Sequence, residues 1–140
     1  MKKSLVYGYG SLTHVGKSRA LNEDAVLALP ELSLYGVADG YGGTGAGDFA
    51  AKLVLEKIKF LIEHGLGDSE VTLPFVYRSY YTATGNLLFN AFLYANSELI
   101  ASNKDRHINE RGGSSSVFIS LQSRHATIAS VGSCLALLIR

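Results

Sequence analysis

The stretch from Asp39 to Gly47 constrains the fold of this chain most strongly, because it holds five glycines directly after a short apolar run. The glycines stand at positions 40, 42, 43, 45 and 47. Glycine destabilises helix and strand interiors and supports tight turns, so the stretch predicts a loop. The run before it, 33–38, predicts a strand, and residues 48–64 after it carry apolar side chains at helical spacing. We therefore expect a strand, a glycine-rich loop and a helix in succession.

Two helices are predicted in the middle of the chain. The first runs from Asp48, as its N-cap, to His64, and Gly65 is its stop signal. The second spans about 75 to 102, with an interruption near Gly85, because its apolar residues recur at spacings of three and four.

Short apolar or alternating runs predict the strands, at 5–9, 25–29, 33–38, 115–121, 126–131 and 134–139. The order of strands, two helices and strands indicates the α+β class with a mainly antiparallel sheet. The last run is apolar throughout and only Arg140 follows it, so we expect a covering part of the structure to be missing. Residues 1–140 are predicted to form a single incomplete domain.

Composition excludes several classes of protein. Hydrophobic residues make up 47% of the chain, enough for a packed core. Thirteen basic and twelve acidic residues give a net charge of +1, which predicts no nucleic-acid or membrane surface. No apolar run is long enough to span a membrane, and the single Cys134 fits a reducing compartment. We expect a soluble, cytoplasmic protein.

Three phosphate-binding patterns nearly match, and physical reasons disfavour each. The segment 40–45 fits a dinucleotide fingerprint, but Asp39 would face the pyrophosphate. The segment 10–18 resembles a P-loop with one residue too many. Cys134 and Arg140 have the spacing of cysteine phosphatases, but an apolar strand between them offers no phosphate-binding turn. Cys134 is predicted to be a small buried residue.

An acidic constellation remains. Glu23 and Asp24 precede one predicted strand, and Asp39 ends the strand 33–38. Adjacent strands could bring these carboxylates together, where their mutual repulsion would favour a bound cation. Oxygen ligands select Mg²⁺ or Mn²⁺, and Gly40 would let a backbone carbonyl approach the ion. The alternative is that these acids only form solvated turns.

These residues belong to four ordered segments that resemble the motifs of the metal-dependent type 2C protein Ser/Thr phosphatases. The segments are Arg19-x3-Glu23-Asp24, Val37 to Gly43, Gly112 to Val117 and Ala129 to Ser133. The resemblance implies an antiparallel β-sandwich flanked by helices, of which this chain is the N-terminal portion. It also implies hydrolysis of phosphoserine or phosphothreonine in proteins by a water that bridges two Mn²⁺ or Mg²⁺ ions.

The resemblance implies a role for each site residue. Asp39 is similar to the carboxylate that bridges both metals, Gly40 to the carbonyl ligand and Glu23 to a ligand of one ion. Asp24 resembles the acid that hydrogen-bonds the metal waters. Arg19 resembles the clamp on the substrate phosphate, although it could also be a plain surface arginine.

The chain departs from the family pattern in three ways. Tyr41 replaces a frequent histidine, Ser133 replaces an acid, and the aspartates of the family's later half have no counterpart. A second interpretation is therefore an inactive, truncated relative that binds phosphoproteins or another partner. Both interpretations allow this chain to associate with a second copy of itself or with the missing C-terminal half.

Overall fold

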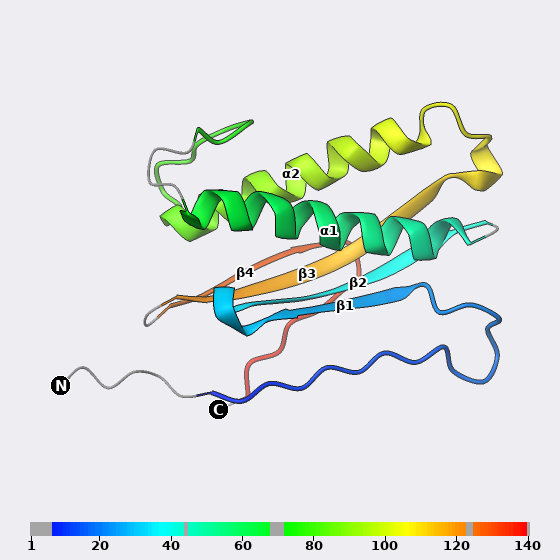
Figure 1. The fold of residues 1–140 in the computed structure, drawn as a ribbon, viewed down its shortest axis with the longest axis horizontal. Coiled ribbons are helices and arrows are strands. Elements are labelled where there is room, and N and C mark those ends of the chain that lie inside the picture. The colour runs from blue at the N-terminus through cyan, green and yellow to red at the C-terminus, as the bar shows by residue number, and fades with distance from the viewer. Residues whose placement is uncertain (1–6, 44, 68–71, 123–124, 140) are drawn as a thin grey trace.

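A computed structural model describes residues 7–43, 45–67, 72–122 and 125–139 of the chain, as four strands and two long helices (Figure 1). The elements are β1 (Asp24–Leu29), β2 (Leu34–Gly42), α1 (Ala46–Gly67), α2 (Ala83–Asn103), β3 (Gly112–Gln122) and β4 (His125–Val131). Single turns of 3-10 helix, η1 (Pro30–Leu32) and η2 (Ile108–Glu110), connect some of them. The predicted α+β class is confirmed.

The strands form one antiparallel sheet in the order β1-β2-β3-β4. Along β2, buried side chains alternate with more exposed ones from Leu34 onward, as expected for a strand with one covered face. Both helices cover that face (Figure 1). Direct Cα partners share a face, so the register of β2 with its neighbours determines which side chains meet on each side of the sheet.

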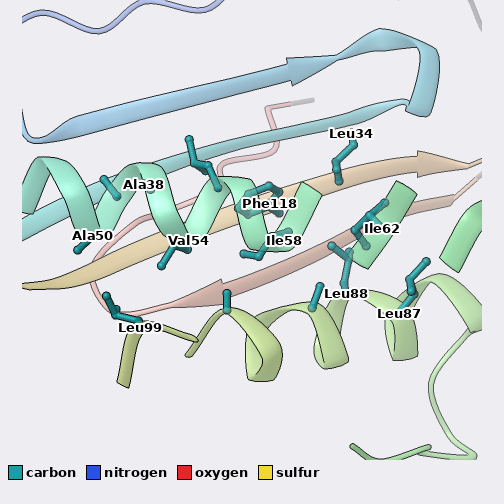
Figure 2. Close-up of a cluster of buried hydrophobic side chains, with 14 residues drawn as sticks. Leu34, Ala38, Ala50, Val54, Ile58, Ile62, Leu87, Leu88, Leu99 and Phe118 are labelled. Atoms are coloured by element: carbon teal, nitrogen blue, oxygen red, sulfur yellow. The ribbon is translucent and has the colours of Figure 1, made fainter. Parts of the chain in front are cut away.

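The core lies between the sheet and the two helices (Figure 2). Leu34 of β2, Ile58 of α1, Leu88 of α2 and Phe118 of β3 are all fully buried. Phe118 also meets the ring of Phe92 edge to face, at 5.8 Å between centroids. Burial of this layer from four elements holds the sheet and the helix pair together.

Among the described residues, the opposite face of the sheet is covered by irregular chain alone. Residues 9–12 and 135–137 line a hollow of about 440 Å³ against this face, together with side chains such as Val37 and Val117. Four large apolar side chains after β4 remain 80–90% exposed: Leu135, Leu137, Leu138 and Ile139. The described residues thus contain one sheet, where the resemblance implied part of a two-sheet sandwich.

The structure corrects the predicted boundaries of the first helix and of the glycine loop. Strand β2 continues to Gly42, so Asp39 lies inside the strand instead of at its end. Pairing with β3 supplies the hydrogen bonds that extend β2 through its glycines. Helix α1 begins at Ala46 and reaches Gly67, so Asp48 lies in its first turn and Gly65 does not stop it.

The second helix begins later than predicted, at Ala83. The side chain of Thr82 caps it by accepting a hydrogen bond from the N–H of Gly85 at 3.0 Å. The residues before this cap are not helical, because Asn86 and Asn90 of α2 hydrogen-bond the backbone of residues 75–78.

Two predicted strands are absent from the part of the chain that the structure describes. Residues 7–9 of the run 5–9 are irregular, and residues 5 and 6 lie outside the described residues. Residues 134–139 are irregular as well, because no neighbouring strand in the described part of the chain pairs with them. Within the same ranges, neither helix is long and apolar enough to cross a membrane.

Candidate metal centre

Two carboxylates face each other where β1 begins. Asp24 and Asp39 are direct Cα partners across β1 and β2, so both side chains lie on the face of the sheet opposite the helices. Burial, then the charge of Asp39 and a hydrogen bond with its carboxyl, raise the pKa of Asp24. Of the three acids predicted to converge, the register brings Asp24 and Asp39 together, whereas the carboxylate of Glu23 lies against Gly47 of α1.

Gly40 lies at a point of very close backbone approach. Its N–H donates to the carbonyl of Glu23 at 3.0 Å, which extends the β1–β2 pairing by one step. A Cβ atom at this position would collide with the backbone carbonyl of Gly47 in α1 and would lie 2.7 Å from the Glu23 carbonyl oxygen. Only glycine fits between β1 and the first turn of α1.

Glu23 and Arg19 form an ion pair beside this point. A guanidinium nitrogen of Arg19 lies 3.2 Å from Oε2 of Glu23, and the Arg19 side chain is 72% exposed while that of Glu23 is 16% exposed. The other carboxylate oxygen of Glu23 lies against Gly47 at the start of α1. The positive end of the α1 dipole therefore favours the charge of Glu23.

The structure brings two further side chains, Ser115 and Cys134, to the acidic pair that sequence reasoning did not place there. Ser115 is the Cα partner of Asp39 on β3, and its Oγ accepts from the N–H of Ser133 at 3.2 Å. Cys134 is half-buried and lies close enough to Asp39 and Asp24 to respond to their charges. Burial is the main cause that raises the pKa of its thiol.

The expectation that Cys134 is a plain buried residue is therefore only partly right. The β2–β3 register and the turn after β4 bring it to the acids, and no local pattern in the sequence encodes that contact.

Tyr41 continues the same face of β2 beyond Asp39. Its ring lies across Gly113 of β3, where a Cβ atom would collide with the ring and its hydroxyl, and the residue is 63% exposed. The phenol group thus lies over β3, on the same face of the sheet as Asp39 and two residues further along β2. In the family whose motifs the sequence resembles, a histidine frequently stands at the position of Tyr41.

The donors fit part of a site for a hard divalent cation. Carboxylates and a backbone carbonyl are oxygen ligands of the kind that Mg²⁺ and Mn²⁺ prefer. Within the described ranges, no group of three or more His, Cys, Asp or Glu side chains lies close enough to hold an ion. The described acids therefore match a part of a metal centre and do not complete its coordination.

The family profile described as Protein phosphatase 2C matches residues 11–140. Because this is most of the chain, the protein belongs to the protein phosphatase 2C family.

Among solved structures, the chain is similar to the Mycobacterium tuberculosis serine/threonine phosphatase PstP/Ppp, with 26% identity and a TM-score of 0.65 over 85% of this chain and 44% of that one. It is similar to PppA of Pseudomonas aeruginosa, described as a key regulatory component of T6SS, with 28% identity and a TM-score of 0.64 over 85% of this chain and 45% of that one.

A third similar structure is the catalytic domain of PstP in complex with two manganese ions, at 25% identity and a TM-score of 0.65. It is matched over 85% of this chain and 45% of its own length. The chain thus spans less than half the length of these three structures. Comparison with the curated proteins gives no match.

Proposed function

We propose that residues 1–140 supply the N-terminal part of the active site of a metal-dependent protein Ser/Thr phosphatase. The observation that carries this proposal is the pair of carboxylates at Asp24 and Asp39, which face each other beside the close-packed Gly40. Family membership and the manganese-bound structure of PstP support the same chemistry. The substrate class is a phosphoserine or phosphothreonine in a protein.

Each residue then has a chemical task. The carboxylates of Asp39 and Glu23 and the carbonyl of Gly40 would hold Mn²⁺ or Mg²⁺, two ions being expected in a complete domain. A bound cation would neutralise phosphoryl oxygens and lower the pKa of a coordinated water. Asp24 would accept hydrogen bonds from water at the site, since its carboxyl lies directly opposite Asp39.

Arg19 is suited to hold the substrate phosphate. Its side chain is mostly exposed and, among the described residues, its guanidinium pairs with Glu23 alone, so it can rotate toward a phosphate without breaking a buried contact. A planar guanidinium binds two phosphate oxygens at once, which orients the phosphoryl group.

A second candidate function is phosphoprotein or partner binding without turnover. It is favoured by the incomplete cluster of acids among the described residues. In this case Glu23, Asp39 and Gly40 would form one weak cation site.

The two functions are separated by Mn²⁺ binding and hydrolysis of p-nitrophenyl phosphate, both measured on the 140-residue chain. Asp39→Asn tests the site, and Asp48→Asn is a matched control, because Asp48 lies in α1 and pairs with Lys52 at 2.7 Å. Mn²⁺-dependent turnover that Asp39→Asn abolishes would support the phosphatase. Mn²⁺ binding that depends on Asp39 without turnover would support the binding function. Mn²⁺ binding that is equal in both variants would contradict both assignments of Asp39.

A further inference from the structure

A row of three side chains crosses the sheet on the face that carries the acidic pair. Asp24 of β1, Asp39 of β2 and Ser115 of β3 are successive Cα partners, so they lie side by side on that face. The hydroxyl of Ser115 is therefore the neighbour of Asp39 on the side away from Asp24.

Ser115 holds the turn that follows β4. Its Oγ accepts a hydrogen bond from the N–H of Ser133 and a second one from the Ser133 hydroxyl, both at 3.2 Å. The pairing of β4 with β3 ends at Val131, before this turn begins. The two bonds to Ser133 thus continue the attachment to β3 where the backbone ladder stops.

Gly132 brings the backbone of the turn into direct contact with Ser115. Its φ of +78° is a left-handed conformation that favours glycine. A Cβ atom at this position would collide with Oγ of Ser115 and would lie 2.8 Å from its Cβ. The turn therefore packs on the Ser115 side chain as well as bonding to it.

The same turn places Cys134 beside the acidic pair. Cys134 is half-buried, and its thiol lies near enough to Asp39 and Asp24 to respond to the charge of both. The chain then continues beneath the sheet, on the face opposite the helices (Figure 1). The turn, residues 132–134, thus forms a wall of the acidic pair on the side of β4.

We propose that Ser115 is a positioning residue for the metal centre, because it fixes the turn 132–134 against Asp39 and so restricts the orientations of that carboxylate. This inference rests on the proposed function, in which Asp39 is a ligand of Mn²⁺ or Mg²⁺. A carboxylate that is already held in place loses less conformational freedom when it binds an ion. Loss of a group that orients a metal ligand commonly weakens metal binding by about 10–100-fold.

Alkylation of Cys134 by iodoacetamide measures the position of the turn without any metal. Cys134 is the single cysteine of the chain, so the reaction reports on this turn alone. Ser115→Ala removes both bonds to Ser133 and is expected to accelerate alkylation by about fivefold or more.

Ser130→Ala is the matched control for this variant. Ser130 is an exposed serine of β4, and its β3 partner, Val117, lies two residues from Ser115, so both serines are on the same face. Among the described residues, Ser130 has no side-chain hydrogen bond to the turn, and its variant should react at the rate of the unaltered protein.

A second pair of variants displaces the turn while leaving Ser115 unchanged. Gly132→Ala places a methyl group against Oγ of Ser115 and is expected to accelerate alkylation of Cys134. Gly16→Ala is its control, because Gly16 has a similar φ of +77° but a Cβ there meets nothing within 4 Å. Circular dichroism verifies that both variants fold.

Mn²⁺ affinity, measured by electron paramagnetic resonance of the free ion, tests the effect on the ligand. Ser115→Ala is expected to weaken Mn²⁺ binding by about tenfold. Ser115→Thr keeps the hydroxyl and is expected to restore both the affinity and the slow alkylation. Urea unfolding of the same variants separates this effect from a general loss of stability, because reduced stability alone would leave the Mn²⁺ affinity of the folded chain unchanged.

The outcomes distinguish this inference from the proposed function. Equal alkylation rates in Ser115→Ala and Ser130→Ala would overturn the role of Ser115, whatever the metal does. Undiminished Mn²⁺ affinity of Ser115→Ala, in a chain whose Mn²⁺ binding depends on Asp39, would also overturn it and would leave the proposed function standing. Absence of Mn²⁺ binding by the unaltered chain would contradict the proposed function and, with it, the positioning of a metal ligand.

Discussion

At the scale of single residues, two positions show how tightly the chain is packed on each side of the sheet. Gly40 lies where β1, β2 and the first turn of α1 converge, and Tyr35 lies on the opposite face among other tyrosines.

Gly40→Ala is expected to destabilise the fold by about 1–3 kcal/mol, because the new methyl group meets the Gly47 carbonyl and the Glu23 backbone. Urea unfolding followed by circular dichroism measures the change in free energy. Gly10→Ala is the matched control, since a Cβ there meets nothing within 4 Å. Equal stability of the two variants would show that Gly40 is not at a close approach.

Tyr35 is expected to ionise late in an alkaline titration. Burial, then the neighbouring Tyr7 phenol, raise its pKa to about 12. The folded-state pKa exceeds the unfolded value near 10. The contribution of the protonated Tyr35 phenol to the stability of the fold is therefore full below pH 10 and is lost as the pH rises toward 12. Ultraviolet absorbance of tyrosinate measures this, and Tyr35→Phe should remove the phase near 12.

The control for that titration is Tyr80→Phe, which alters a tyrosine that is 73% exposed. The late phase should persist in this variant. Its persistence in Tyr35→Phe would assign it to another residue.

At the scale of elements, α2 holds an irregular segment, residues 75–78, to its own surface. Asn90 is fully buried; its Oδ1 accepts from the N–H groups of Phe75 and Val76, and its Nδ2 donates to the Val76 carbonyl at 2.7 Å. Asn86 binds the backbone of Arg78 in the same way. These two asparagines act like a neighbouring strand and explain why helical periodicity before residue 83 does not form a helix.

Asn90→Ala is expected to cost about 1–3 kcal/mol for each backbone group that loses its partner while still buried. Hydrogen exchange at the amides of Phe75 and Val76 should accelerate, and thermal unfolding should occur at a lower temperature. Ser97→Ala is the control, because its hydroxyl bonds only to a carbonyl of its own helix, that of Tyr94. Unchanged exchange at Phe75 in Asn90→Ala would contradict the role of this side chain.

At the scale of the whole molecule, stability depends on one apolar layer on a single face of the sheet. Phe118 lies at its centre, against Phe92 and above Gly36, where a Cβ atom would meet the Phe118 ring. The opposite face has no comparable layer among the described residues, since the last apolar residues are exposed.

Phe118→Ala is therefore expected to destabilise the fold by about 3–5 kcal/mol, the usual cost of a buried phenylalanine. Ile119→Ala is the matched control, because Ile119 points to the opposite face of β3. Its loss of folding stability should be clearly smaller than that of Phe118→Ala. Chemical denaturation of both variants measures the difference. Equal losses would mean that the two faces of the sheet contribute alike.

The sequence by itself determined the elements whose signals are local. The hairpin of β1 and β2, the body of both helices, β3 and β4 follow from periodicity and turn residues. The acids at 23, 24 and 39 and the glycine at 40 were also identifiable, because they lie in compact motifs. The metal roles of these residues remain predictions.

Only the tertiary structure decided the features that depend on distant partners. Asp39 lies inside β2 because β3 pairs with it, and Cys134 reaches the acidic pair through the turn after β4. Residues 75–78 stay irregular because Asn86 and Asn90 bind their backbone. The run 134–139 forms no strand because an apolar segment needs a paired neighbour to become one. Backbone pairing across long sequence separations is not encoded in local periodicity, so these contacts appear only when the chain is folded.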